Sequence, residues 1–162
     1  MGKKEQTENL ESLKERLKRK FDELAEPMKH VDCTLENYEK LFPDNKVLTP
    51  IGEVNLGKNQ FEKLKANDRE NLLGAMYQTL TDPVAVIKEE DNRGEIKLFT
   101  KSFKNGEERL KGLMSVIIDR NGTKIVISTH RRKPNNIINK IKNPADLLYE
   151  KQIDGVAGYG WV

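Results

Sequence analysis

The sequence predicts an α+β fold in which N-terminal helices precede a four-stranded antiparallel β-meander, a short C-terminal helix and an edge strand. Three observations predict this class. Apolar residues recur at helical spacing in several segments before Pro83, and β-rich runs with alternating side chains follow at positions 84–131. Asn121-Gly122 stands between two of these runs, and this dipeptide is the strongest short signal for a β-hairpin.

The N-terminal part of the chain is predicted to form two helices. The first spans residues 7–26 and ends at Pro27, with a narrow apolar stripe made of Leu10, Leu13, Leu17, Phe21 and Leu24. Because this stripe is too short for a coiled coil, we expect the helix to dock on its own domain, and a partner-binding or linker helix is the alternative. Thr34 is expected to cap a second helix that ends at Leu41, and a turn at 42–45 then leads into the main domain.

The main domain is predicted to begin with a strand at 47–54 and to continue with two helices. Asn59 and Glu62 resemble a capping box that opens the first, and the second begins near Asp68 and stops before Pro83. Strands are expected at 84–88, 95–103, 112–119 and 123–131, a helix at 134–142 and an edge strand at 147–149. The chain is thus divided into an N-terminal helical extension (1–45), the main domain (46–152) and a flexible Gly-rich tail (153–162) that contains Trp161.

Basic residues are concentrated in one part of the chain. The whole sequence has 29 Lys and Arg against 26 Asp and Glu, a net charge of +3, so the average charge identifies no partner. The segment 120–142 contains no acid, and its basic residues are Arg120, Lys124, Arg131, Arg132, Lys133, Lys140 and Lys142. Such a segment is typical of a surface that binds nucleic acid, and a set of solvated strand ends and helix faces is the alternative.

Several classes of protein are excluded by the composition and by missing motifs. Cys33 is the single cysteine, which rules out an internal disulfide and a cysteine-based zinc finger. No apolar run has the length of a signal peptide or a transmembrane helix, so we expect a cytoplasmic protein that does not contact a membrane. The sequence also contains no Gly-rich phosphate loop, dinucleotide fingerprint, Ser-His-Asp order or metal-ligand histidine pair.

Four short segments resemble a known family: TPIGEV at 49–54, LTDPVAVI at 80–87, IVISTH at 125–130 and LLYE at 147–150. Together with the order of helices before a four-stranded meander, they resemble the phage-associated branch of the barnase, EndoU, colicin and RelE-like (BECR) nucleases. The resemblance extends from residue 47 to residue 149 and leaves the N-terminal helices outside it. Most of the matching positions are turn and core residues, so the resemblance implies a barnase-like fold more strongly than a particular chemistry.

The resemblance implies a metal-independent endoribonuclease of the toxin or effector type, which cleaves RNA by attack of the 2′-hydroxyl and needs no cofactor. The implied partners are RNA and an immunity or antitoxin protein, and we expect a monomer encoded by a bacterium or a phage. Site residues carry over only at 128–132, where polar and basic groups commonly line the active groove of this family. The main domain has no second histidine, so an acid and base pair of Glu and His would use Glu53 or Glu95, and the sequence does not distinguish them.

His130 is the candidate for one proton transfer. Metal-free RNA cleavage needs a base for the 2′-hydroxyl proton, an acid for the leaving 5′-oxygen and fixed cations around the transition state. An unperturbed imidazole titrates at about pH 6.5 and can do either task. Basic residues that can hold phosphate follow it directly, and the preceding Ser128 and Thr129 can bond a phosphate oxygen. The alternative is a solvent-facing strand end without a catalytic role.

A second group of candidates lies on the predicted strand 95–103. Alternation places Lys97, Phe99, Lys101 and Phe103 on one face. If exposed, this face would suit single-stranded RNA, because rings stack on bases and lysines neutralise the backbone; Lys101 would stabilise the transition state electrostatically. In the alternative, the rings face the helices and the lysines extend outward. The candidate catalytic residues are therefore His130, Lys101, Thr129 and Arg131, the candidate RNA-binding residues are Arg132, Lys133, Lys97, Phe99 and Ser128, and no metal site is predicted.

Two other functions remain as alternatives. Glu95 and Lys97, with Asp44 upstream, weakly resemble the acid-x-lysine arrangement of magnesium-dependent restriction-type nucleases. The gap of 51 residues (95 minus 44) is long for that motif. The second alternative is a non-catalytic module that binds RNA or a partner protein through the same basic surface. Cleavage in EDTA separates the metal-independent enzyme from the first alternative, and binding without turnover identifies the second.

Overall fold

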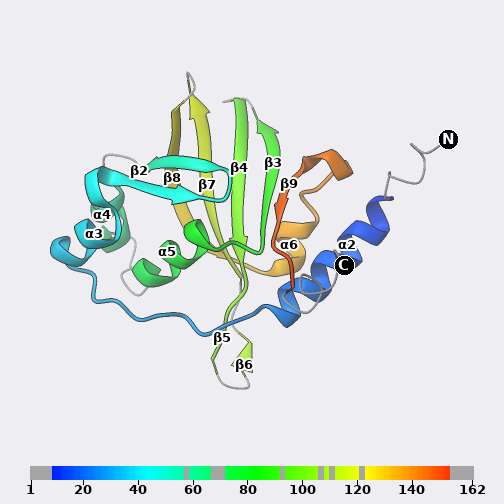
Figure 1. Cartoon of the computed structure of the whole chain (residues 1–162), viewed down its shortest axis with the longest axis horizontal. Coiled ribbons are helices and arrows are strands. Elements are labelled where there is room, and N and C mark those ends of the chain that lie inside the picture. Colours follow the sequence, from blue (N-terminus) through cyan, green and yellow to red (C-terminus); the bar gives the residue numbers. More distant parts are fainter. Residues whose placement is uncertain are drawn as a thin grey trace, which may run out of the picture.

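A computed structural model gives the arrangement of these elements in space (Figure 1). It describes residues 9–56, 59–66, 72–91, 94–105, 108–109, 112–120 and 123–153. For residue 91, for the strand residues between 105 and 132 and for residue 134, the description covers the backbone alone. The predicted helix start near Asp68, the Asn121-Gly122 dipeptide and the Gly-rich tail beyond Ile153 lie outside the described residues.

The described helices are α2 (Leu10–Glu23), α3 (Leu35–Leu41), α4 (Gln60–Ala66), α5 (Leu73–Thr81) and α6 (Pro134–Ile138), with short 3₁₀-helices at Pro43–Asn45 and Pro144–Asp146. The side chain of Asn9 caps α2 by accepting a hydrogen bond from the backbone N–H of Ser12 at 2.8 Å. Thr34 caps α3 in the same way at 3.1 Å, which confirms the predicted cap. α6 ends well before the predicted end at Lys142.

The strands are β1 (Lys46–Thr49), β2 (Gly52–Leu56), β3 (Ala85–Asp91), β4 (Gly94–Lys101), β5 (Lys104–Asn105), β6 (Glu108–Arg109), β7 (Gly112–Arg120), β8 (Thr123–Arg132) and β9 (Leu147–Glu150). The prediction of one strand at 47–54 is wrong, because the chain turns at Pro50 and Ile51 and makes a hairpin of β1 and β2. Gly52 follows this turn with a φ of +115°, which glycine adopts without steric cost.

The α+β class is confirmed, but the sheet is larger than the predicted one. Its order is β1-β2-β8-β7-β4-β3-β9. β3, β4, β7 and β8 pair antiparallel in succession, and the small hairpin of β5 and β6 lies between β4 and β7 in the chain. β9 pairs with β3 as the predicted edge strand. At the opposite side, β2 pairs parallel with β8 over Asn55↔Ile125 and Leu56↔Val126.

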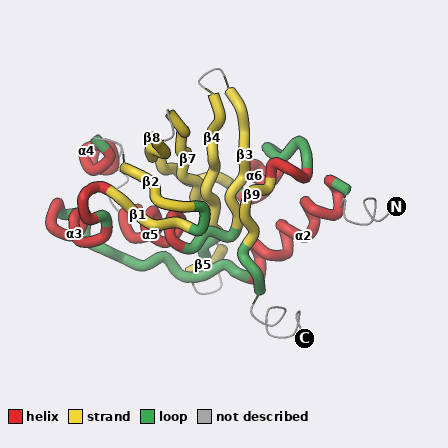
Figure 2. The backbone as a smooth tube through the Cα atoms, turned by 45° about the horizontal axis from the view of Figure 1, so that its top comes forward, coloured by secondary structure: helices red, strands yellow, loops and turns green. Residues whose placement is uncertain are grey.

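Helices cover both faces of this sheet. Alternation along β4 sends Leu98 into a cluster with α2 and α6, and Phe99 into a second cluster with α3, α4 and α5. The side chains of β3 alternate in the same way: Ala85 and Ile87 belong to the first cluster, and Val86 belongs to the second. Figures 1 and 2 show α2 and α6 at one side of the sheet and α3, α4 and α5 at the other.

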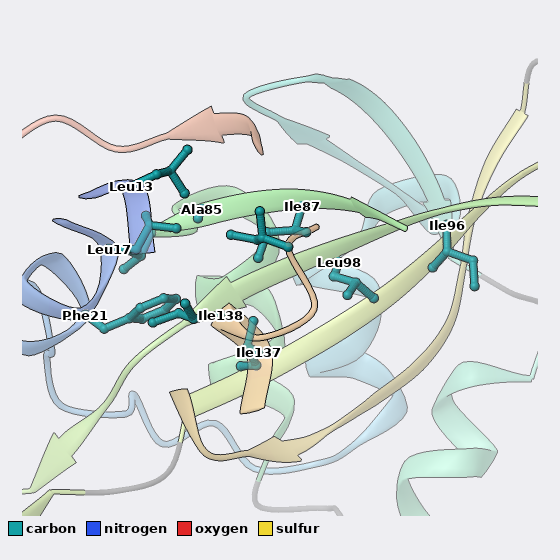
Figure 3. Packing of buried hydrophobic residues seen from close by; sticks show 11 residues of the cluster. Leu13, Leu17, Phe21, Ala85, Ile87, Ile96, Leu98, Ile137 and Ile138 are labelled. Carbon is teal, nitrogen blue, oxygen red and sulfur yellow. The ribbon is translucent and has the colours of Figure 1, made fainter. Parts of the chain in front are cut away.

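Helix α2 is part of the hydrophobic core. Leu13, Leu17 and Phe21 are buried in the first cluster together with β3, β4 and α6. Figure 3 shows these side chains gathered with those of β3 and with Ile138 of α6. The packing therefore confirms the expectation that this helix docks on its own domain.

An irregular segment at 25–34, here called the strap, connects α2 to α3 and runs past α5 (Figure 1). The side chain of Gln78 in α5 accepts a hydrogen bond from the backbone N–H of Lys29 at 2.9 Å and donates one to the carbonyl oxygen of Pro27 at 3.1 Å. The strap passes so close to Gly74 that a Cβ atom there would overlap with the carbonyl oxygen of Lys29. Glycine at 74 is thus required by a close approach of two backbone segments.

Candidate active site

The candidate segment 128–132 forms the C-terminal end of β8. It pairs with β7 through Ser128↔Val116, Thr129↔Ser115, His130↔Met114, Arg131↔Leu113 and Arg132↔Gly112. The described pairing of β8 with β2 ends at Val126, so within the described residues the segment 128–132 has a strand partner on one side only.

A β-bulge lies immediately before this segment. Val126 pairs with Ile117 and Ser128 pairs with Val116, which leaves Ile127 as an extra residue on β8. Bulges bend a strand, increase its local twist and re-aim the side chains that follow, and they are frequent next to active sites. The backbone therefore changes direction at the point where the polar and basic residues of β8 begin.

The sheet register brings the two groups of candidates to the same end of the sheet. On β7, Leu113 pairs with both Arg131 and Lys101, and Ser115 pairs with both Thr129 and Phe99. β7 lies between β4 and β8, so the Cα atoms of such residues are about 10 Å apart. The backbone positions of the two groups therefore lie at the same end of the sheet.

The side chain of Lys101 contradicts its predicted role. It is 1% exposed, and its Nζ donates hydrogen bonds to the carbonyl oxygen of Asp82 at 2.8 Å and to Oδ2 of Asp82 at 3.2 Å. Glu26 Oε1 lies 3.0 Å from the same Nζ. A lysine held in this way neutralises two partly exposed carboxylates and has no free surface for a substrate.

The rings on β4 face the helices, as in the alternative given above, and the two lysines are buried instead of extending outward. Phe99 is fully buried in the second hydrophobic cluster, and Phe103 is packed against Leu72 and Ala75. Lys97 is 7% exposed, and its Nζ lies 2.7 Å from Glu95 Oε2. Alternation predicted which residues share a face, but helix α5 contacts β4 on that face and excludes a base-stacking groove there.

The remaining candidates lie at and after the end of β8. Lys133 is exposed, and its carbonyl oxygen accepts hydrogen bonds from Asn136 and Ile137 at the start of α6. For Ser128, Thr129, His130, Arg131 and Arg132, the structure fixes the strand position and the pairing partner. Lys133 is therefore the predicted RNA-binding residue whose exposure is shown.

Neither carboxylate predicted as a partner of His130 lies near it in the sheet register. Asn55 on β2 pairs with Ile125, which places Glu53 beside the start of β8. Ile96 on β4 and Ile125 on β8 both pair with Ile118, which places Glu95 at the same far end. Because a strand rises about 3.3 Å per residue, both positions are roughly 20 Å from His130. Glu95 is moreover ion-paired with Lys97, as described above.

Two groups of charged residues that the sequence did not reveal attach α2, the strap and the segment at β9 to the rest of the fold. The first, called the Asp82 cluster, consists of Glu26, Asp82, Lys101 and Lys151, with Lys151 Nζ 2.8 Å from Asp82 Oδ2. Burial acts to raise the pKa of Asp82, but the hydrogen bond from Lys151 and the charge of Lys101 lower it below its ordinary value. Burial likewise opposes the charged form of Lys151, and its bond to Asp82 raises the pKa of Lys151 above the ordinary value.

The second group, called the Glu150 cluster, attaches α2 to β9. Arg16 donates from Nη2 and Nε to the two oxygens of Glu150 at 2.7 and 2.8 Å, and Lys20 Nζ lies 2.6 Å from Glu150 Oε2. Burial acts to raise the pKa of Glu150, but the hydrogen bonds from Arg16 and Lys20 lower it below its ordinary value. The carboxylate is therefore ionised at neutral pH and holds two cations of one helix.

Comparisons of the chain with protein-family models, with curated proteins and with solved structures gave no match. The resemblance to the BECR nucleases therefore stays a prediction. Among the described residues, no three His, Cys, Asp or Glu side chains come together as a group that could hold a metal ion. In the same part of the chain, no helix is both long and apolar enough to cross a membrane.

Proposed function

We propose that this protein is a metal-independent endoribonuclease of the toxin or effector type. The observation that supports this most is the β-bulge at Ile127, followed by a polar and basic strand end that, among the residues the structure describes, pairs with a strand on one side only. A bulge re-aims a strand without disturbing the rest of the ladder, and function is commonly built at such places. The exposed Lys133 extends the basic strand end beyond β8.

In this proposal, His130 transfers a proton while the following basic residues hold the phosphate. His130 takes the 2′-hydroxyl proton or donates one to the leaving 5′-oxygen, and Arg131 stabilises the charge of the transition state. Arg132 and Lys133 bind the RNA backbone, and the hydroxyl groups of Ser128 and Thr129 donate hydrogen bonds to phosphate oxygens. The proposal gives no role in binding or catalysis to Lys97, Phe99 and Lys101, because their side chains are buried.

The partners follow from the same proposal. An RNA-cleaving toxin acts on cytoplasmic RNA, and the cell or phage that makes it needs an immunity or antitoxin protein to hold it inactive. We also propose that the protein acts as a monomer. The proposal names no second acid or base beside His130, because Glu53 and Glu95 lie at the far end of the sheet.

Incubation with total bacterial RNA in EDTA tests the proposal. The protein should cleave RNA and leave single-stranded DNA of the same sequence intact, because DNA lacks the attacking hydroxyl. The new 3′ ends should carry a 2′,3′-cyclic phosphate. Cleavage that appears only with Mg²⁺ would replace the proposal with a restriction-type nuclease, and RNA binding without any cleavage would replace it with a binding module.

A further inference from the structure

A pocket of about 400 Å³ lies between α2 and the chain that follows β9. It is separate from the end of β8 in sequence and in the elements that form it. Its lining residues are Arg16, Arg19, Lys20, Glu23, Glu150, Gln152 and Ile153. This volume is in the range of sites that bind small molecules, about 300–1,000 Å³.

The pocket wall has an excess of positive charge. Three lining side chains are cationic (Arg16, Arg19 and Lys20) and two are carboxylates (Glu23 and Glu150), which leaves a net charge of +1. The cations come from successive turns of α2, so they project to the same side of the helix. An anion entering this pocket is therefore attracted to it.

The inner part of the wall is held in place before any ligand arrives. Both oxygens of Glu150 are bonded within the Glu150 cluster, and Lys20 Nζ also donates to the carbonyl oxygen of Lys151 at 2.9 Å. The side chain of Lys20 is 10% exposed. Binding at such a wall requires little further ordering of side chains, which favours affinity.

The mouth of the pocket contains Arg19, a cation without an ion-pair partner among the described residues. Arg19 is exposed and makes no ion pair with any residue that the structure describes, whereas Glu23 stands one turn later on the same helix. The planar guanidinium of an arginine presents paired N–H donors that match two oxygens of a phosphate group. We infer that this pocket binds a phosphate group, with Arg19 as the side chain that contacts it directly.

Two kinds of molecule carry that chemistry, a free nucleotide and an RNA strand. The inference does not rest on the proposed ribonuclease function, because a nucleotide site can exist without cleavage. Calorimetric titration of the whole protein with adenosine monophosphate, and separately with a short deoxyribose oligonucleotide that cannot be cleaved, distinguishes the sources. Binding of the mononucleotide identifies a small-molecule site, and binding of the strand alone identifies a backbone contact. Either result supports a phosphate site in this pocket when Arg19→Ala weakens the binding, because a strand held only at the end of β8 would bind this variant unchanged.

Three variants locate the site. Arg19→Ala should weaken binding about tenfold, the usual effect of losing one charge-assisted contact. Glu23→Gln should strengthen it several-fold, because it removes a carboxylate beside the ligand. Lys18→Ala is the matched control, since Lys18 is exposed on the same helix, carries the same charge and does not line the pocket. Equal weakening by Arg19→Ala and Lys18→Ala, or no binding of either probe, would overturn the inference.

Discussion

Replacing Leu17 by alanine tests whether α2 belongs to the core. Leu17 is 0% exposed and packs in the first hydrophobic cluster with β3, β4 and α6. Burying a leucine side chain contributes about 2 kcal/mol by transfer from water, and a cavity left by truncation adds to the loss. Leu17→Ala should therefore lower the free energy of unfolding by about 3 kcal/mol, within the roughly 2–5 kcal/mol measured for buried leucines.

Urea denaturation followed by circular dichroism measures this change, and Leu35→Ala is the matched control. Leu35 is also a leucine of an N-terminal helix, but it is 54% exposed, so its replacement should change the free energy of unfolding by less than about 0.5 kcal/mol. By the same reasoning, deletion of residues before Leu35 should abolish the cooperative transition. A Leu17→Ala variant as stable as the control, or a truncated chain that unfolds cooperatively, would refute the assignment of α2 to the core.

Three further predictions concern the strap and the charged clusters. Gly74→Ala should cost about 1–3 kcal/mol in urea denaturation because its Cβ would overlap with the strap, and unchanged stability would show that the strap moves freely. The pKa values of Asp82 and Glu150 are lowered by folding, so the stability that these carboxylates contribute is fully present above the ordinary carboxyl pKa and is lost as the pH falls through their lowered pKa values in the folded protein. Replacing both residues by their amides should flatten this acid dependence of the free energy of unfolding, and an unchanged acid profile would contradict the ion pairing. Lys101→Ala should lower the free energy of unfolding by about 1–3 kcal/mol, a smaller loss than for a fully buried ion pair because its carboxylate partners are partly exposed. Lys104→Ala, at an exposed position, should be nearly neutral in the same assay. Equal effects of the two variants would exclude a structural role for Lys101.

Local periodicity predicted the parts of the fold that depend on neighbouring residues. The helical stripe of α2 includes Leu13, Leu17 and Phe21, and these side chains are buried. The antiparallel pairing of β3 with β4 and of β7 with β8 also follows from short connections. In both cases the information lies within a few residues along the chain.

The remaining features depend on residues far apart in sequence. β2 pairs with β8 through Asn55 and Ile125, which are 70 positions apart (125 minus 55), and no local pattern specifies that partner. Alternation on β4 grouped Phe99 and Lys101 correctly on one face, but coverage of that face by α5 is a tertiary property. Because Lys101 shares a face with Phe99, its burial could have been anticipated, and a buried lysine requires a carboxylate partner. That requirement was the signal in the sequence for the Asp82 cluster.

The two histidines of the chain provide the most direct measurement of the proposed ribonuclease function. RNA cleavage in EDTA should fall by about 10² to 10⁴ in His130→Ala, the usual contribution of a general acid or base. His30→Ala should keep the full rate, because the His30 side chain is 77% exposed on the strap and bonds only Asp32 among the described residues. Cleavage by His130→Ala at the rate of His30→Ala, with the same cyclic phosphate products, would contradict the assignment of the active site to the end of β8.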